Sequence, residues 1–286
     1  MPFTVPTGVT SRPIAVIGAG TLGRRVALMF ATRGGEVRIF DPLPPVRADA
    51  VEFVTSELPA VVATIESGAA GRAVAAEDLG SAVAGAWLVI EAVPEKFELK
   101  ASVLAALDDA SDADALLATN SSSFPSSVFA STVRSPERLL NMHFFMPPAQ
   151  RAVELMSSGA TDPRALELLQ LTLPLFGLRP FVARQESMGF IFNRVWAAMK
   201  REVLQVVAEG VATPEDIDAL WKLNTGLPFG IFQGMDQVGL DVALDIEENY
   251  ASRYPHLSEA PRRLLRQYVD AGHLGVKSGR GFFTYD

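Results

Sequence analysis

Apolar residues in the first two thirds of the chain form two alternating patterns, short continuous runs and longer stretches with helical spacing. The continuous runs are typical of buried strands and lie at Arg12–Ile17, Val37–Phe40, Trp87–Ile90, Leu116–Thr119 and Leu139–Phe144. Helical spacing is found at Leu22–Arg33, Val46–Ile65 and Glu95–Leu107, and Pro59 is expected to break or kink the second of these helices. Strands that alternate with helices predict an α/β fold with a doubly wound parallel sheet.

The pattern changes near Ser187, and the chain beyond it is predicted to be helical. A long helix is expected over Phe190–Glu209, and Thr213 with Pro214 opens the next one as its N-cap and first residue. Helical spacing continues at Phe229–Val238 and Asp241–Tyr254, and a strand signal returns only in the last few residues. We therefore predict a nucleotide-binding domain over residues 1–186 and an all-helical domain over residues 187–286.

Composition and charge narrow the classes of function. Of the 286 residues, 49% are hydrophobic and 20% are charged, which is typical of a globular protein. The formal net charge of −8 disfavours a nucleic-acid partner, because phosphate binding depends on Lys and Arg. The absence of cysteine excludes disulfides and thiolate metal sites, and no metal site is predicted. With neither a secretory signal at Met1–Ser11 nor an apolar run of membrane-spanning length, we expect a cytoplasmic protein without a membrane partner.

A glycine-rich motif connects the first predicted strand to the first predicted helix. It has the form G-x-G-x-x-G and reads Gly18-Ala19-Gly20-Thr21-Leu22-Gly23. In this position between strand and helix, the pattern predicts a dinucleotide site. The first glycine permits a tight turn, the second lets backbone N–H groups approach the pyrophosphate, and the third allows the helix to pack closely on the strand. The N-terminus of the helix supplies partial positive charge for the phosphates.

Asp41 follows the second predicted strand and bears on the type of cofactor. A carboxylate at this position accepts hydrogen bonds from ribose hydroxyls and repels a 2′-phosphate, so NAD is favoured over NADP. FAD uses the same motif and is the nearer competitor. In the alternative without a ligand, the glycines serve only a turn and Asp41 caps a helix.

His143 is the leading candidate for an acid–base residue. It lies near the end of an apolar strand, and ligands bind at the carboxyl ends of strands in a parallel sheet. Oxidation of an alcohol by hydride transfer needs a base for the hydroxyl proton, and histidine suits this role near neutral pH. Glu154 lies in a second apolar run, where a buried acid is costly unless it is paired. We therefore predict a His143–Glu154 pair, the alternative being a structural core histidine.

Two further groups of polar residues are candidates for substrate or cofactor contacts. The run Thr119-Asn120-Ser121-Ser122-Ser123 follows a buried strand and can hydrogen-bond a substrate oxygen or a nicotinamide. Asn193 lies early in the long helix, where asparagine is unfavourable unless its side chain makes a directed contact. A solvated turn and an exposed helix position are the alternatives for these two groups.

Taken together, these motifs resemble the 3-hydroxyacyl-CoA dehydrogenase family over nearly the whole chain. The matching segments are Val16–Gly23, Glu91–Glu95, Thr119–Ser123, His143–Pro147, Val153-Glu154, Gly189–Arg194, Pro214–Asp218, Asp236–Asp241 and Gly275–Tyr285. The resemblance implies a Rossmann-type domain, a helical domain that forms a homodimer, a site in the cleft between them, and fatty acid metabolism. It also implies that His143 is the base and Glu154 its orienting partner.

The same resemblance assigns the remaining contacts. It implies that Ser122 and Asn193 contact the hydroxyl or keto oxygen of a small-molecule substrate. It places Glu95 and Lys100 at the nicotinamide side of the cofactor, together with Asn120. The expected reaction is the NAD-dependent interconversion of a 3-hydroxyacyl substrate, as a CoA thioester, and its 3-keto form.

Three departures from the family pattern keep other substrates open. Met146 stands where the family has Asn, and the connection from Met146 to Glu154 is one residue shorter. The stretch Val51–Ile65 of the second predicted helix has no Lys or Arg and is only flanked by Arg47 and Arg72, although the family places CoA-binding lysines there. The alternatives are a dehydrogenase of a small free hydroxy acid, similar to carnitine or gulonate dehydrogenases, and a catalytically silent NAD-binding sensor.

Overall fold

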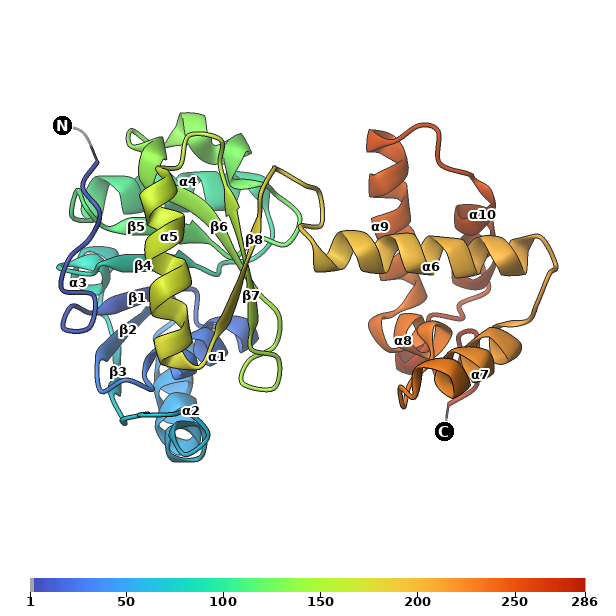
Figure 1. Cartoon of the computed structure of the whole chain (residues 1–286), viewed down its shortest axis with the longest axis horizontal. Coiled ribbons are helices and arrows are strands. Elements are labelled where there is room, and N and C mark those ends of the chain that lie inside the picture. The colour runs from blue at the N-terminus through green and yellow to red at the C-terminus, as the bar shows by residue number, and fades with distance from the viewer. Residues whose placement is uncertain (1–2, 286) are drawn as a thin grey trace. The chain divides into compact units, whose positions relative to one another are not determined.

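The computed structural model describes residues 3–285 of the chain. The chain forms two compact units, of which one ends at Ile191 and the other begins at Phe192 (Figure 1). The hydrophobic pattern alone places the change at residue 187, within the connection that leads into the second unit. No helix among the described residues has the length and apolar character that a membrane crossing requires.

One eight-stranded sheet forms the centre of the first unit. Its strand order is β3-β2-β1-β4-β5-β6-β7-β8, and all neighbours are parallel except β6 and β7. The strands are β1 (Ile14–Ile17), β2 (Glu36–Phe40), β3 (Arg72–Ala75), β4 (Leu88–Glu91), β5 (Leu116–Thr119), β6 (Leu139–Phe144), β7 (Ala152–Ser157) and β8 (Arg179–Ala183). The strand order reverses between β1 and β4, which is where doubly wound folds bind nucleotides.

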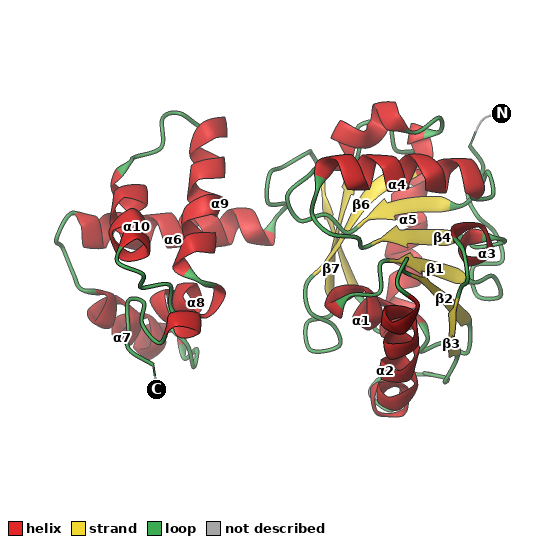
Figure 2. Ribbon diagram, turned by 180° about the vertical axis from the view of Figure 1, so that it is seen from behind, coloured by secondary structure: helices red, strands yellow, loops and turns green. Residues whose placement is uncertain are grey.

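Helices cover both faces of this sheet (Figure 2). They are α1 (Thr21–Phe30), α2 (Pro44–Val62), α3 (Leu79–Val83), α4 (Phe97–Ala110) and α5 (Pro163–Thr172), with 3₁₀ turns at Ser126–Thr132, Pro136–Arg138 and Leu173–Phe176. One hydrophobic cluster joins α1, α2 and α5 to the sheet, and another joins α3 and α4 to the opposite face. Since both faces are covered, β1, β4, β5 and β6 are buried along their whole length.

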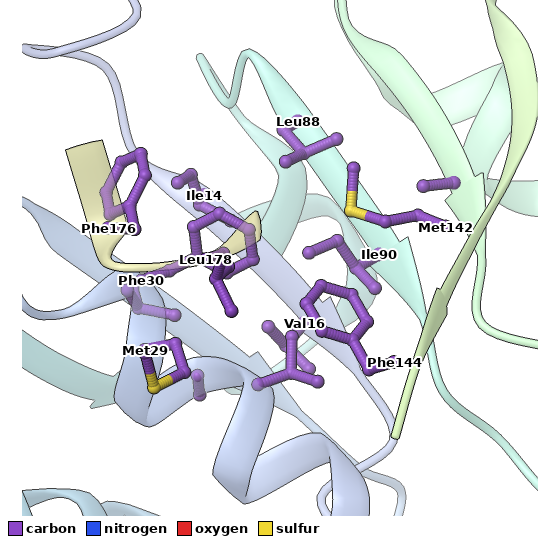
Figure 3. Close-up of a cluster of buried hydrophobic side chains, with 14 of the residues drawn as sticks. Ile14, Val16, Met29, Phe30, Leu88, Ile90, Met142, Phe144, Phe176 and Leu178 are labelled. Atoms are coloured by element: carbon purple, nitrogen blue, oxygen red, sulfur yellow. The ribbon is translucent and has the colours of Figure 1, made fainter. Parts of the chain in front are cut away.

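The larger cluster shows how strand residues alternate between the two faces (Figure 3). Val16 and Ile90 point into it beside Phe30 of α1, whereas Ala15 and Ile17 belong to the cluster on the other face. Phe30 contacts Phe144 and Phe176 edge to face, with ring centroids 6.2 and 5.0 Å apart. Such geometry is favourable for aromatic pairs and fixes the position of α1 on the sheet.

The predicted α/β fold with a doubly wound sheet is confirmed, and the structure adds detail at three points. Pro59 does not break α2, which continues to Val62 with Leu58 and Val61 buried in the core. The sheet is not wholly parallel, since β7 runs against β6. The last residues form no named strand among those described, only the isolated bridges of Arg280 with Gly275 and Thr284.

The second unit is helical over its described part. It consists of α6 (Phe192–Ala208), α7 (Pro214–Thr225), α8 (Ile231–Val238), α9 (Leu240–Arg253) and α10 (Ala260–Asp270), followed by a 3₁₀ turn at Val276–Ser278. Its core gathers around Phe232, Met235 and Leu265. A buried ion pair between Arg201 and Glu247, 2.7 Å apart, connects α6 to α9.

The buried carboxylate of Asp236 fixes the end of the chain to α8. Its Oδ1 accepts the N–H of Phe282, and its Oδ2 accepts the N–H of Phe283 and the hydroxyl of Tyr285, each at 2.9 Å. Burial and the bond to Asp236 raise the pKa of the Tyr285 hydroxyl. A Cβ on Gly281 would lie 2.0 Å from Asp236 Oδ1, so glycine is required there. The closing motif of the sequence therefore serves the fold of this unit.

Gly23 provides a test of how closely α1 must approach β1. A Cβ at this position would lie 1.9 Å from the carbonyl oxygen of Gly18, which is backbone and cannot move aside freely. We expect Gly23→Ala to lower the free energy of unfolding by about 2 kcal/mol or more. At Gly20 a Cβ would meet nothing within 4 Å, so Gly20→Ala is the matched control. Urea denaturation of the two variants measures the difference, and equal stabilities would contradict this account.

Candidate active site

The candidate site lies at the carboxyl edge of the sheet, where β1, β4, β5 and β6 end. A pocket at this edge is lined by the glycine loop, Asp41, the segment from Ala92 to Pro94, and Leu99. Gly18 adopts a φ of +102°, and a Cβ there would lie 2.5 Å from the carbonyl oxygen of Ala92. Only glycine fits where the loop approaches Ala92 this closely, and no side chain at position 18 enters the pocket.

The first turn of α1 has the features of an anion site. Its N-cap is Gly20, and no side chain accepts the N–H groups of the turn that begins with Thr21 and Leu22. Thr21 is exposed and Leu22 half-buried, and both line the pocket. Uncapped N–H groups at a helix N-terminus bind phosphate, and Gly20 leaves space for it to approach. The residues therefore fit the pyrophosphate of a dinucleotide.

Asp41 both braces the glycine loop and faces the pocket. Its Oδ2 accepts the N–H of Ala19 and its Oδ1 accepts the N–H of Leu43, each at 3.1 Å. Each carboxylate oxygen has a second lone pair, so the half-buried side chain retains acceptors for the hydroxyls of a ribose. The contact with Leu43 at the start of α2 therefore leaves room for a ribose contact, so the two roles that the sequence leaves as alternatives are compatible.

A buried charge network lies under the loop that follows β4. The ammonium of Lys100, whose side chain is 1% exposed, bonds Glu91 Oε1 at 2.8 Å, the carbonyl of Val93 at 3.2 Å and Glu95 Oε2 at 3.2 Å. These contacts engage all three of its N–H donors. Lys100 therefore positions the loop from Glu91 to Glu95, and its contact with the cofactor stays a prediction.

Glu91 is the centre of this network and was not predicted from the sequence as a site residue. It is fully buried and also accepts the N–H of Val93 at 2.7 Å and the hydroxyl of Thr119 at 2.6 Å. Its position as the last residue of an apolar strand is the signal that identifies it, because an acid buried there needs partners. Glu91 thereby ties the ends of β4 and β5 together.

Glu95 and Asn120 extend the network towards the pocket and towards β6. Burial raises the pKa of Glu95, but the Ser121 hydroxyl at 2.6 Å and the Lys100 charge outweigh it, so the net shift is downward. Glu95 is therefore an ionised carboxylate at neutral pH. Asn120 Oδ1 accepts the N–H of Phe144 at 2.9 Å, which joins the end of β5 to the end of β6.

His143 and Glu154 lie directly opposite each other in the antiparallel β6–β7 pair. The distance from His143 Nδ1 to Glu154 Oε2 is 3.0 Å, and the residues are 5% and 3% exposed. The Oε1 atom of the same carboxylate accepts the N–H of Ile191 at 2.9 Å. This contact suits the tautomer in which Nδ1 donates to the carboxylate and Nε2 is the acceptor.

Aromatic rings hold the imidazole in place. Phe190 stacks on it with ring centroids 4.9 Å apart and planes 12° apart, and Phe145 contacts it edge to face at 4.9 Å. Phe190 has a φ of +54°, a left-handed conformation that is rare for a bulky residue. Hydrogen bonds with Ser187 on both its N–H and its carbonyl maintain this turn. This turn places the Phe190 ring on the imidazole of His143.

The other predicted residues are more dispersed. Ser122 is exposed, and its neighbour Ser121 is the hydroxyl that the network engages. Asn193 lies on the first turn of α6, in the second unit, and its substrate role stays a prediction. Met146, which departs from the family pattern, is 43% exposed directly after the His143 strand.

Comparison with known proteins places these features in a family. A model of the 3-hydroxyacyl-CoA dehydrogenase NAD binding domain matches residues 13–185, and a model of the 3-hydroxyacyl-CoA dehydrogenase C-terminal domain matches residues 189–285. The structure of (S)-3-hydroxybutyryl-CoA dehydrogenase from Ralstonia eutropha is similar with a TM-score of 0.85 and 29% identity, covering 96% of this chain and 99% of that chain.

Two curated relatives show the range of the family. The 5-formyl-3-hydroxy-2-methylpyridine 4-carboxylate 5-dehydrogenase of Mesorhizobium japonicum is 31% identical over 281 residues, which are 96% of this chain and 91% of that protein. The 3-hydroxyacyl-CoA dehydrogenase-like protein LAM1 of Cochliobolus heterostrophus is 45% identical over 154 residues, 53% of this chain. The alignment spans 32% of LAM1, so that similarity concerns about a third of the relative.

Asp41 provides a test of cofactor choice. We expect Asp41→Ala to weaken NADH binding and to reduce the preference for NADH over NADPH, because the ribose acceptor and the negative charge are both lost. Asp41→Asn removes the charge and keeps one of the two oxygens that accept N–H groups of the loop, so it should relax the preference with a smaller loss of NADH affinity than Asp41→Ala. Fluorescence titration with both nucleotides measures the two effects. An unchanged preference in both variants would mean that Asp41 serves only the loop.

Proposed function

Since this chain belongs to the 3-hydroxyacyl-CoA dehydrogenase family and is an NAD-dependent oxidoreductase, we propose that it interconverts a 3-hydroxyacyl-CoA thioester and its 3-keto form. The observation that supports the reaction most directly is the buried pair of His143 and Glu154, with 3.0 Å between Nδ1 and Oε2. An acid–base group of this kind, at the edge of a nucleotide-binding sheet, suits the oxidation of a hydroxyl.

In the oxidative direction His143 acts as the general base. Its Nε2 atom takes the proton of the 3-hydroxyl group, and in the reverse direction the imidazolium returns it to the keto oxygen. NAD, when bound, accepts the hydride that leaves the substrate carbon. Glu154 holds the ring orientation through Nδ1 and stabilises the positive charge that forms on the imidazole.

The surroundings of the pair strengthen this charge stabilisation. His143 and Glu154 are shielded from water by Phe145, Phe190 and the sheet itself, and electrostatic interactions are stronger where water is excluded. Before proton transfer, the Glu154 carboxylate faces a neutral His143 imidazole. After proton transfer, it faces an imidazolium, and the two residues form an ion pair. The carboxylate therefore favours proton transfer to the ring, which is what an alcohol oxidation requires.

Further residues complete the proposed site. We assign Ser122 and Asn193 to the substrate oxygen, and Glu95 with Asn120 to the nicotinamide side of the cofactor. Lys100 positions Glu95 through their ion pair at 3.2 Å. We also propose a homodimer formed through the second unit, where α7 carries exposed apolar side chains such as Leu220 and Leu223.

A second candidate function keeps the chemistry and changes the substrate to a small free keto or hydroxy acid. It is favoured by the lack of Lys and Arg over residues 51–65 of the chain. A relative that covers nearly the whole chain is named for a pyridine carboxylate, which supports the same alternative. A silent NAD-binding sensor is the third candidate, and it predicts that loss of His143 changes nothing.

The substrate assay separates these candidates. NADH oxidation is followed with acetoacetyl-CoA, with its short N-acetylcysteamine thioester, and with free keto acids that include acetoacetate. We expect the CoA thioester to give the highest kcat/KM. Turnover of a free acid without thioester turnover would move the enzyme to the second candidate, and NADH binding without any turnover would support the sensor.

The acid–base pair has its own test. We expect His143→Ala to lower kcat by about 10²–10⁴-fold. Glu154→Gln keeps an oxygen for the Ile191 N–H but replaces the charge that faces Nδ1, so it should lower kcat by about 10²-fold with little change in KM. Glu66→Gln makes the same chemical change at an exposed position and is the control. Glu154→Gln with wild-type kcat would show that the carboxylate does not assist His143.

A further inference from the structure

Two consecutive arginines near the start of α1 converge on one aromatic ring of α2. The guanidinium carbon of Arg24 lies 4.5 Å from the ring centroid of Phe53, and that of Arg25 lies 5.5 Å from it. The three side chains are half-buried. Stacking on one ring holds two planar cations in a fixed place between α1 and α2.

Neither arginine has a carboxylate partner among residues 3–285. The guanidinium of Arg24 makes no hydrogen bond there, and that of Arg25 makes one, from Nη1 to the carbonyl of Pro147 at 3.3 Å. Both Nε atoms are buried without an acceptor. Carboxylates pair with Arg12, Arg38, Arg138 and Arg201, whereas Arg33, Arg47 and Arg151 bond carbonyl or hydroxyl oxygens, so the buried Nε atoms without an acceptor distinguish Arg24 and Arg25.

Two like charges held together in this way need a counterion. The chain has a net charge of −8, yet no acid is placed within ion-pair distance of either guanidinium in the described chain. Each guanidinium presents five N–H donors, whose planar arrangement matches phosphate and carboxylate oxygens. A bound anion would satisfy these donors and remove the repulsion between the two cations.

The position of the pair points to the substrate side of the site. Arg24 and Arg25 directly follow the glycine loop, but they do not line the dinucleotide pocket. Through Pro147, Arg25 contacts the loop that leaves β6 four residues after His143. The pair therefore lies beside the cofactor site and next to the segment that carries the proposed base.

We propose that Arg24 and Arg25, braced by Phe53, form a subsite for the phosphate groups of the CoA part of the substrate. This proposal rests on the proposed function. It answers the lack of basic residues over 51–65, because α2 contributes an aromatic platform and the neighbouring helix contributes the charge. The side chains that bind the CoA phosphates are thus located on α1.

Binding of free CoA tests the subsite without turnover. Isothermal calorimetry is carried out with the wild type, the double variant R24A/R25A, and Arg33→Ala as a control arginine at the other end of α1. We expect the double variant to bind CoA about 10- to 100-fold more weakly, and the control to bind as the wild type does. R24K/R25K keeps the charge without the planar donors and should be intermediate. A wild type that does not bind CoA, or a double variant that binds it equally well, overturns the proposal.

A comparison of substrates separates phosphate binding from other roles. In R24A/R25A, KM for acetoacetyl-CoA should rise about tenfold or more, whereas KM for the N-acetylcysteamine thioester and the affinity for NADH should not change. An equal rise for both thioesters would mean that Arg25 only anchors the Pro147 loop, and a loss of NADH affinity would assign the pair to the cofactor. Either result overturns the proposal, as does a rise confined to a free keto acid.

The two proposals can fail separately. If no thioester is turned over but CoA binding still depends on the arginines, the reaction assignment is wrong and the subsite remains. If thioesters are turned over and the double variant matches the wild type in both experiments, the reaction remains and the subsite is wrong.

Discussion

The register between β6 and β7 determines whether the proposed acid–base pair can form at all. Residues opposite each other in an antiparallel ladder point to the same face, so His143 meets Glu154 across the pair. A slip of one residue would turn Glu154 to the other face of the sheet. The antiparallel pairing of β7 with β6 is what sets this register in an otherwise parallel sheet, so the proposed chemistry depends on it.

Paired charges hold the rest of this edge in position. Glu91 and Lys100 are buried together, and each is costly in the interior without the other. Their contacts with Thr119, Val93 and Glu95 fix the positions of the loops after β4 and β5. Asn120, which follows β5, accepts a hydrogen bond from the N–H of Phe144 at the end of β6. A continuous set of hydrogen bonds therefore connects the ends of three strands, β4, β5 and β6, and most of the polar groups in it bond one another.

The features that could be predicted from the sequence are those that appear as a run or a spacing of residue types along the chain. Continuous apolar runs indicate the central strands, and an acid within such a run indicates a partner, as for Glu154. The edge strands β3 and β8 are half exposed and lack that signal. The hydrogen bond from Ser121 to Glu95 depends on the turn after β5, and the pairing of Arg24 and Arg25 on Phe53 depends on how two helices pack. Neither arrangement is visible as a spacing along the chain.

Glu154 divides its two oxygens between the imidazole of His143 and the N–H of Ile191, at the point where the chain leaves the first unit. One carboxylate thus serves as counterion and as anchor, which links the two events thermodynamically. In the reaction that we propose, protonation of the ring would strengthen its attraction for the carboxylate and would thereby act on the hydrogen bond to Ile191. By reciprocity, a change at Ile191 would alter proton uptake by the ring by the same free energy. The proposed base and the last residue of the first unit thus share one carboxylate.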